Sequence, residues 1–277
     1  MITVVNFADR KFKRNQRWSS ISAKLFGKVN KVIEYGPKDI EKKIKEKNKE
    51  SVKFNNKGFG NYYWKPFIVN KALDKIKEGD YLMYVDSGSF FLKSILPLVK
   101  HMEVKQKNIL CFKLPLIEKQ WTKRDTFLLM DCDSKEYINS PQILSGFFIV
   151  KKCNESISFL KSWQEYATDS RILSDDANAL EMPNYKEFIE HRHDQSILSL
   201  LCKKNKHVLI EGDLSDYGCF PYRYVLNPKH IFDKHILENP KENIFRGSIL
   251  CNRSGHPLLY LVKYVVRSII YKFGVKV

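Results

Sequence analysis

Residues 81–89 read YLMYVDSGS, an apolar segment that ends at a carboxylate, Asp86, and then turns at serine and glycine. The unbroken apolar run of Tyr81–Val85 is typical of a strand buried on both faces of a sheet. Ligands of open α/β sheets bind beyond the carboxyl ends of the strands, so Asp86 is a candidate ligand-binding residue. Alternatively, Asp86 only begins the turn, which is common for Asp-Ser-Gly.

Strand-like and helical segments alternate around this stretch, which predicts an α/β fold with a parallel or mixed sheet flanked by helices. No Gly-x-Gly-x-x-Gly or P-loop motif supports a dehydrogenase or a P-loop NTPase. The polar and aromatic segment 118–139 is expected to be a substrate loop. The expected strands are Ile2–Phe7, Lys31–Tyr35, Tyr81–Val85, Asn108–Phe112, Leu144–Val150 and His207–Ile210, and the expected helices are Ile40–Lys49, Pro66–Ile76, Asn154–Tyr166 and Gln195–Lys204.

The positive charge is concentrated at the two ends of the chain. The 277 residues carry 48 Lys and Arg against 31 Asp and Glu, a formal net charge of +17. Residues 1–60 hold 16 basic and 6 acidic residues, and residues 241–277 hold 7 and 1. Such clustering suits either nucleic acid or anionic lipid. The absence of an RNP, KH or Cys2His2 motif favours the lipid hypothesis.

The C-terminal segment 257–277 mixes aliphatic and aromatic residues with Lys263, Arg267 and Lys272. Lys263 and Arg267 share one helical face, which is typical of an amphipathic helix at a membrane surface. The alternative is a last helix packed on the protein core. We expect a domain at 1–256 followed by this helix. The scattered cysteines and the lack of a secretory signal or membrane-spanning run predict a cytoplasmic protein.

Two further segments concentrate polar and aromatic side chains. Residues 60–66 read GNYYWKP, which places Trp64 and Lys65 at a helix N-terminus, where a diphosphate is favoured. Alternatively, Trp64 fills the core and Lys65 is a surface cation. Residues 190–196 read EHRHDQS, and this density of guanidinium, imidazole, carboxylate and amide suits a phosphate and sugar site. Alternatively, Asp194 is only the N-cap of the helix that follows.

These segments, together with LSGFFI at 144–149 and in this order, resemble bacterial GT-A-type glycosyltransferases of capsule and lipopolysaccharide biosynthesis. The resemblance covers roughly residues 2–215. It implies a GT-A-like single domain that binds a nucleotide-sugar over a Rossmann-like half-domain. It also implies a divalent metal, Mn or Mg, at an Asp-x-Asp pair. Asp86 matches the first Asp, but Gly88 occupies the second position, so the metal dependence is open.

The resemblance also implies roles for individual residues. Asp86 and Asp194 would be catalytic, with Asp194 either the base of an inverting reaction or a grip on the donor sugar in a retaining one. Asp86 and His256 would hold the metal, and Lys65 and Arg192 the phosphates. By position alone, the turn after the first strand would hold the nucleobase and ribose. The donor-binding residues are then Asn6, Ala8, Trp64, Lys65, Asp86, Ser87, Gly88, His193 and Gln195.

The predicted function is a hexosyl transfer from a nucleotide-sugar, UDP-linked by expectation, to a hydroxyl of a surface glycan. The acceptor would be an oligosaccharide or a lipid-linked chain of capsule or lipopolysaccharide. The basic ends would hold the enzyme at the anionic inner face of the cytoplasmic membrane. No nucleic-acid partner is expected. The alternatives are a basic nucleic-acid-binding protein or nuclease and, because the second carboxylate is missing, a catalytically inactive sugar-binding relative.

Overall fold

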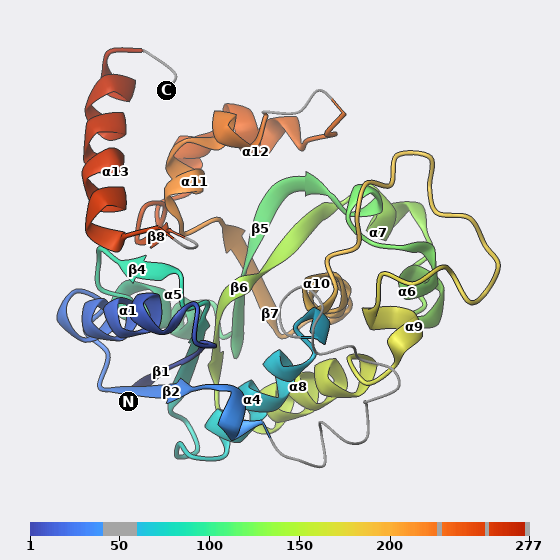
Figure 1. Cartoon of the computed structure of the whole chain (residues 1–277), viewed down its shortest axis with the longest axis horizontal. Helices are drawn as coiled ribbons and strands as arrows, with labels where there is room; N and C mark the ends of the chain where they lie inside the picture. Colours follow the sequence, from blue (N-terminus) through green and yellow to red (C-terminus); the bar gives the residue numbers. More distant parts are fainter. Residues whose placement is uncertain (41–59, 226–228, 253–254, 275–277) are drawn as a thin grey trace.

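Six strands form one mixed sheet in the order β2-β1-β3-β6-β5-β7 (Figure 1). The computed structural model describes residues 1–40, 60–225, 229–252 and 255–274. β1 is parallel to β2 and β3, and β5 is parallel to β7, whereas β6 runs antiparallel to β3 and β5. The predicted mixed α/β class is confirmed. The strands are β1 (Ile2–Phe7), β2 (Lys31–Tyr35), β3 (Tyr81–Val85), β5 (Ile109–Ile117), β6 (Pro141–Lys151) and β7 (Val208–Gly212).

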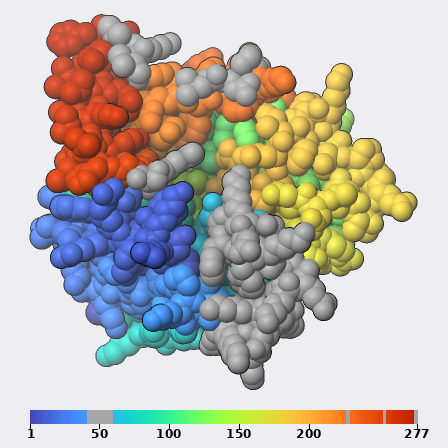
Figure 2. Space-filling view, in the orientation of Figure 1, coloured from blue at the N-terminus to red at the C-terminus, as the bar shows by residue number. Residues whose placement is uncertain are grey.

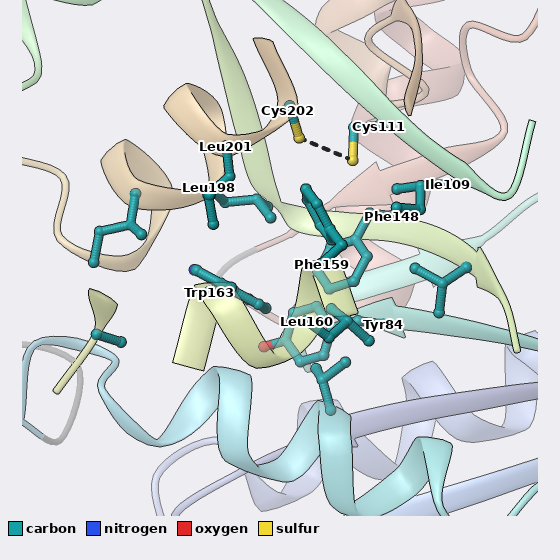
Figure 3. Packing of buried hydrophobic residues seen from close by; sticks show 14 of the residues in the cluster. Tyr84, Ile109, Cys111, Phe148, Phe159, Leu160, Trp163, Leu198, Leu201 and Cys202 are labelled. Carbon is teal, nitrogen blue, oxygen red and sulfur yellow. Dashed lines mark hydrogen bonds between the residues drawn. The ribbon is translucent and has the colours of Figure 1, made fainter. Parts of the chain in front are cut away.

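Three helices cover one face of the sheet, where Leu82 and Tyr84 of β3 point. Trp163 packs edge-on against Phe148 of β6, with ring centroids 5.6 Å apart, beneath the helix that carries Leu198 (Figure 3). The three helices pack on the sheet through one shared apolar cluster. They are α4 (Trp64–Leu73), α8 (Asn154–Tyr166) and α10 (Asp194–Lys204).

The opposite face receives Met83 and Val85 of β3 and is covered by α1 (Lys13–Leu25) and α5 (Leu96–Val104). Because both faces are covered, every residue of β3 is buried, as its apolar sequence predicts. A second, two-stranded sheet lies on this side. Its strands β4 (Ser89–Phe91) and β8 (Ile249–Cys251) are antiparallel, and α13 (Pro257–Lys272) follows β8.

The segment 118–139 is folded into short helices and 10 of its 22 residues are buried, so it is not an open loop, and its contact with substrate stays a prediction. Its Asp125 carboxylate is fully buried and accepts hydrogen bonds from the backbone N–H groups of Ala179 and Leu180. Such a contact with a distant segment leaves no local signal in the sequence. The short elements of the chain are η1 (Pro37–Asp39), η2 (Glu118–Gln120), α6 (Arg124–Leu129), α7 (Lys135–Ile138), α9 (Ser170–Leu173), α11 (Asp216–Cys219), η3 (Pro221–Tyr224), α12 (Lys234–Glu238) and η4 (Pro240–Glu242).

The expected C-terminal helix is present as α13, and none of the described helices is long and apolar enough to cross a bilayer. Of the other expected helices, Ile40–Lys49 falls outside the described residues after its first residue. The helix α1 has no counterpart among the predictions. Its buried face is made of small polar residues, and Gln16 donates to the Asn6 side chain and to the Tyr35 carbonyl, at 2.9 Å each. An apolar periodicity therefore does not reveal it.

Candidate active site

The Asp86 carboxylate lies at the carboxyl end of β3 with its side chain 51% exposed. Its Oδ1 accepts a hydrogen bond from the Tyr84 hydroxyl at 2.6 Å, and its backbone N–H donates to the Gly146 carbonyl of β6 at 2.7 Å. A Cβ at Gly146 would lie 3.2 Å from Asp86 Oδ2, so the glycine leaves room for the carboxylate. The turn and the ligand-binding interpretations are compatible, since Ser89 N–H also closes a turn onto the Asp86 carbonyl.

The Lys65 side chain is buried and joins two carboxylates. Its Nζ lies 2.9 Å from Asp194 Oδ2 and 3.5 Å from Asp86 Oδ1, and it donates to Ser145 Oγ at 3.1 Å. Burial alone would lower the pKa of Lys65, but the charges of Asp194 and Asp86 outweigh it and raise the pKa above its usual value. Lys65 is therefore a buried cation, and the alternative of a surface cation is wrong. Its ammonium is paired with carboxylates, and its predicted phosphate contact stays a prediction.

Asp194 is the first residue of α10, and His193 is the N-cap, so the interpretation of Asp194 as the cap is wrong. Burial raises the pKa of Asp194, and the ion pair with Lys65 acts against it. Trp163 Nε1 donates to the Asp194 carbonyl at 3.1 Å. Gln195 accepts from the Ser145 N–H at 3.2 Å and donates to the side chain of Gln142 at 2.8 Å, so its amide locks α10 onto β6.

The His193 imidazole is buried beside this cluster, in a backbone conformation with φ +49°. Its Nδ1 donates to the Leu173 carbonyl at 3.0 Å. Nε2 lies 3.4 Å from Asp175 Oδ2 and makes no hydrogen bond within the described residues. Asp175 also lines a cavity of about 310 Å³, together with Lys123, Asp176, Ala177, Asn178, Asn184, Phe188, Ile189, Glu190 and His191.

Several residues predicted to bind the donor have other partners. The Asn6 amide bonds Gln16 and Ser20 and is fully buried, so it supports α1. Trp64 is 5% exposed and stacks on Phe7 at 3.9 Å, which confirms the core interpretation of this tryptophan. Ala8 is buried.

The Arg192 guanidinium, predicted to bind phosphate, lies over the ring of Trp121 at 3.9 Å and close to Glu190. Its phosphate contact stays a prediction.

The predicted metal ligands are single residues and not a cluster. No group of three or more His, Cys, Asp or Glu side chains that could hold a metal occurs in the described part of the chain. His256 Nδ1 is nevertheless buried and unpaired among those residues. Asn252 connects the two sites, because its N–H donates to the Gly88 carbonyl at 2.9 Å and its side chain to the Gly255 carbonyl at 2.6 Å. One exposed carboxylate and one unpaired imidazole nitrogen therefore fit a metal that takes its other ligands from substrate and water.

Two residues that position the site were not predicted. Tyr84 lies two residues before Asp86 on the same face of β3, and its hydroxyl holds the carboxylate. Ser145 accepts from Lys65 and donates its N–H to Gln195. The only sequence signal for either was their place within segments already singled out, 81–89 and 144–149.

No family model matches the chain, and no curated protein matches it by sequence. Several similar solved structures are glycosyltransferases, and one is a putative glucose-1-phosphate thymidylyltransferase from Bacillus anthracis. An apo crystal structure of mouse xyloside xylosyltransferase 1 is 13% identical, with a TM-score of 0.46 over 93% of this chain and 100% of that one. The galactosyltransferase LgtC, in complex with donor and acceptor sugar analogs, is 14% identical, with a TM-score of 0.46 over 92% and 87% of the two chains. A glycosyltransferase involved in glycosylation of the major capsid of PBCV-1 is 10% identical, with a TM-score of 0.45 over 93% and 96%. The function proposed below rests on the side chains of the site.

Proposed function

We propose that this protein is a glycosyltransferase that moves a hexose from a nucleotide-sugar to a hydroxyl of an acceptor glycan. The first candidate for the donor is a UDP-sugar. The observation that carries the proposal is the half-exposed Asp86 carboxylate at the end of β3, tied through buried Lys65 to Asp194 at the start of α10. This end of the sheet is where α/β proteins bind their ligands. Each of the four motifs that resemble GT-A enzymes supplies a residue here, since Lys65 contacts Asp86, Ser145 and Asp194.

In the proposed reaction, the bond from the anomeric carbon to the phosphate oxygen breaks and the nucleoside diphosphate leaves. The acceptor oxygen bonds to that carbon, and its proton passes to the departing diphosphate. Asp194 is buried and faces the Lys65 ammonium, which suits a residue that orients Lys65 and a donor-sugar hydroxyl. We assign Asp86, the more exposed carboxylate, to direct contact with the donor. We assign the acceptor to the cavity lined by Asp175, whose carboxylate lies next to the unpaired Nε2 of His193.

The charge of the cluster supports a requirement for a cation. Asp86, Asp194 and Lys65 together carry one net negative charge, and a nucleoside diphosphate would bring more to the same place. We therefore propose that Asp86 and His256 hold a divalent metal, Mn or Mg. When bound, it would neutralise the leaving diphosphate.

We propose a surface glycan as the acceptor, of the capsule or lipopolysaccharide type and lipid-linked at the inner face of the cytoplasmic membrane. A phosphate-linked lipid carrier would present the hydroxyl close to anionic headgroups. The basic ends of the chain, which carry 16 and 7 Lys and Arg, complement such a surface.

The experiment is a screen of UDP-, GDP- and CMP-sugars, read by released nucleotide, on the wild type and on Asp86→Asn. With the correct donor, the variant should lose at least about 100-fold in kcat because a charged contact to the transition state is removed. Its melting temperature should change little, since the side chain is 51% exposed. Asp74→Asn is the matched control, because it makes the same change at an exposed carboxylate that follows the last residue of α4. Full turnover by Asp86→Asn, or no nucleotide release and no thermal shift with any donor, would refute the proposal.

A further inference from the structure

The helix α13 exposes most of its large apolar side chains to solvent. Only Pro257 of its residues is buried. The helix stands at a corner of the molecule, and one of its sides lies against α11 and the segment after it (Figures 1 and 2). The exposed side chains range from 43% to 82% exposure and are Leu258, Leu259, Val262, Val265, Val266, Ile269 and Phe273.

These residues form one continuous stripe with a lysine at each edge. At 3.6 residues per turn, the seven side chains fall within an arc of roughly 120° around the helix axis. On the same projection, Lys272 lies about 20° outside one edge of the arc and Lys263 about 40° outside the other. Both lysines are exposed. Long basic side chains at the edges of an apolar stripe can reach lipid phosphates while the stripe is immersed.

Tyrosines on the opposite side of α13 attach it to the body of the protein. The Tyr260 hydroxyl donates to the buried Asp216 carboxylate at 2.7 Å. Tyr271 stacks on Tyr222 with ring centroids 5.7 Å apart and meets Phe220 edge-on at 5.3 Å. The rotation of the helix about its axis is therefore fixed, and the apolar stripe faces away from the protein.

We propose that α13 docks the protein onto an anionic lipid bilayer, with the helix lying in the plane of the interface and its stripe, from Leu258 to Phe273, among the acyl chains. The helix has 16 residues and is about 24 Å long, which suits an interfacial position. Charge decides between a bilayer and a second copy of the chain. Residues 243–277 contain no Asp or Glu, so two copies of α13 would bring like charges together, whereas anionic headgroups complement them.

The helix α1 adds positive charge beside the start of α13. Asn15 Nδ2 lies 3.3 Å from the Gly255 carbonyl, and the rings of Trp18 and His256 are 6.3 Å apart, so the two helices are neighbours. On the same helix Arg14 and Arg17 are exposed. Each basic side chain near an anionic surface strengthens binding about fivefold. The inference rests on α13 and its surroundings and does not depend on the proposed transferase activity.

The test is cosedimentation of the full chain with vesicles of phosphatidylcholine, alone or mixed with phosphatidylglycerol. The wild type should bind the mixed vesicles and lose binding as salt is added. Val262→Glu/Ile269→Glu should weaken binding at least about 100-fold, because burying each of these side chains contributes more than tenfold. Val104→Glu, at a side chain 70% exposed on α5, is the matched control and should bind normally.

Lys263→Gln/Lys272→Gln should weaken binding roughly 25-fold without changing the apolar stripe, and it keeps the test decisive should the glutamate variant fold poorly. Equal binding to pure phosphatidylcholine would overturn the role of charge. A concentration-dependent dimer in the absence of lipid, abolished by Val262→Glu/Ile269→Glu, together with no vesicle binding, would assign the stripe to a second copy instead. The vesicles contain no donor or acceptor, so either failure leaves the proposed reaction untouched.

Discussion

Replacing Lys65 with methionine removes the cation between two carboxylates while keeping a side chain of similar length. Asp194 would then be left buried and charged with no cation beside it, because its side chain is 3% exposed and Lys65 Nζ lies 2.9 Å away. Breaking a buried ion pair by removing one partner costs about 3–5 kcal/mol. The Asp86 side chain is 51% exposed and at 3.5 Å, so solvent screens its share and it adds little. We expect the free energy of unfolding to fall by about 3–5 kcal/mol.

The pH dependence separates this explanation from a simple packing loss. Without Lys65, burial raises the pKa of Asp194 further, so the folded variant binds a proton more tightly than the unfolded chain does. Lowering the pH from 7 toward 4 should therefore reduce the difference in the free energy of unfolding between Lys65→Met and the wild type. Below the raised pKa of Asp194, the reduction is up to about 1.4 kcal/mol per pH unit. In the wild type, the raised pKa of Lys65 makes its contribution complete below its unfolded pKa, near 10.4, and lost only as the pH rises through the folded value.

The assay is urea unfolding at several pH values, followed by tryptophan fluorescence, since Trp163 is bonded to Asp194. Lys65→Met/Asp194→Asn should recover a large part of the loss, because no charge is then left unpaired in the interior. Lys71→Met on the same helix, where the ammonium binds the Asp39 carbonyl and the Tyr35 ring face among the described residues, should cost about 1 kcal/mol or less. A loss below about 1 kcal/mol for Lys65→Met, or a gap that is constant with pH, would refute a buried ion pair.

Two further predictions concern histidines. Burial, with His193 and Lys123 acting in the same direction, holds the pKa of His191 well below its usual value, so the unfolded state takes up a proton as the pH falls below about 6.5. Between pH 7 and pH 5, the free energy of unfolding of the wild type should fall by up to about 2 kcal/mol more than that of His191→Gln. Equal shifts of the urea midpoint in the two proteins would contradict this prediction. If His256 holds a metal, adding Mn²⁺ with UDP to chelator-treated protein should quench the fluorescence of Trp18, whose ring is 6.3 Å away. Neither His256→Ala nor Trp18→Phe should show this quenching, and full quenching of His256→Ala would remove the histidine from the metal site.

Much of the fold is readable from local patterns, since an apolar run marks β3 and a period of 3.6 marks α8 with its predicted bounds, Asn154–Tyr166. The elements that the sequence did not predict depend on contacts between distant residues. α1 packs through buried Asn and Ser side chains that look solvent-exposed in the sequence. β4 is only three residues long and exists because β8, far along the chain, pairs with it.

The candidate site shows the same division. Asp86 was identified because it follows an apolar strand, and Asp194 because it precedes an apolar helix; both are local features of the sequence. The burial of Lys65 was missed, because a lysine after a tryptophan gives no sign that two carboxylates from distant segments will surround it. Likewise, Gln195 looked like a sugar-binding amide, but both its oxygen and its nitrogen are occupied by β6.

The pairing of β4 with β8 makes the order of synthesis matter. The Asp86 turn is followed directly by β4, and its Gly88 carbonyl is bonded by Asn252, just after β8. During translation the turn must wait for about 160 further residues, which takes roughly 8–30 s at ordinary rates of synthesis, before its last backbone partner leaves the ribosome. A prematurely terminated chain that ends before β8 lacks both α13 and the contacts of β8 and Asn252 with the segment that follows Asp86. The support of the Asp86 turn is thus completed only when α13 is about to be made. If Asp86 binds the donor and α13 binds the bilayer, as proposed above, incomplete chains would not consume the donor away from the membrane.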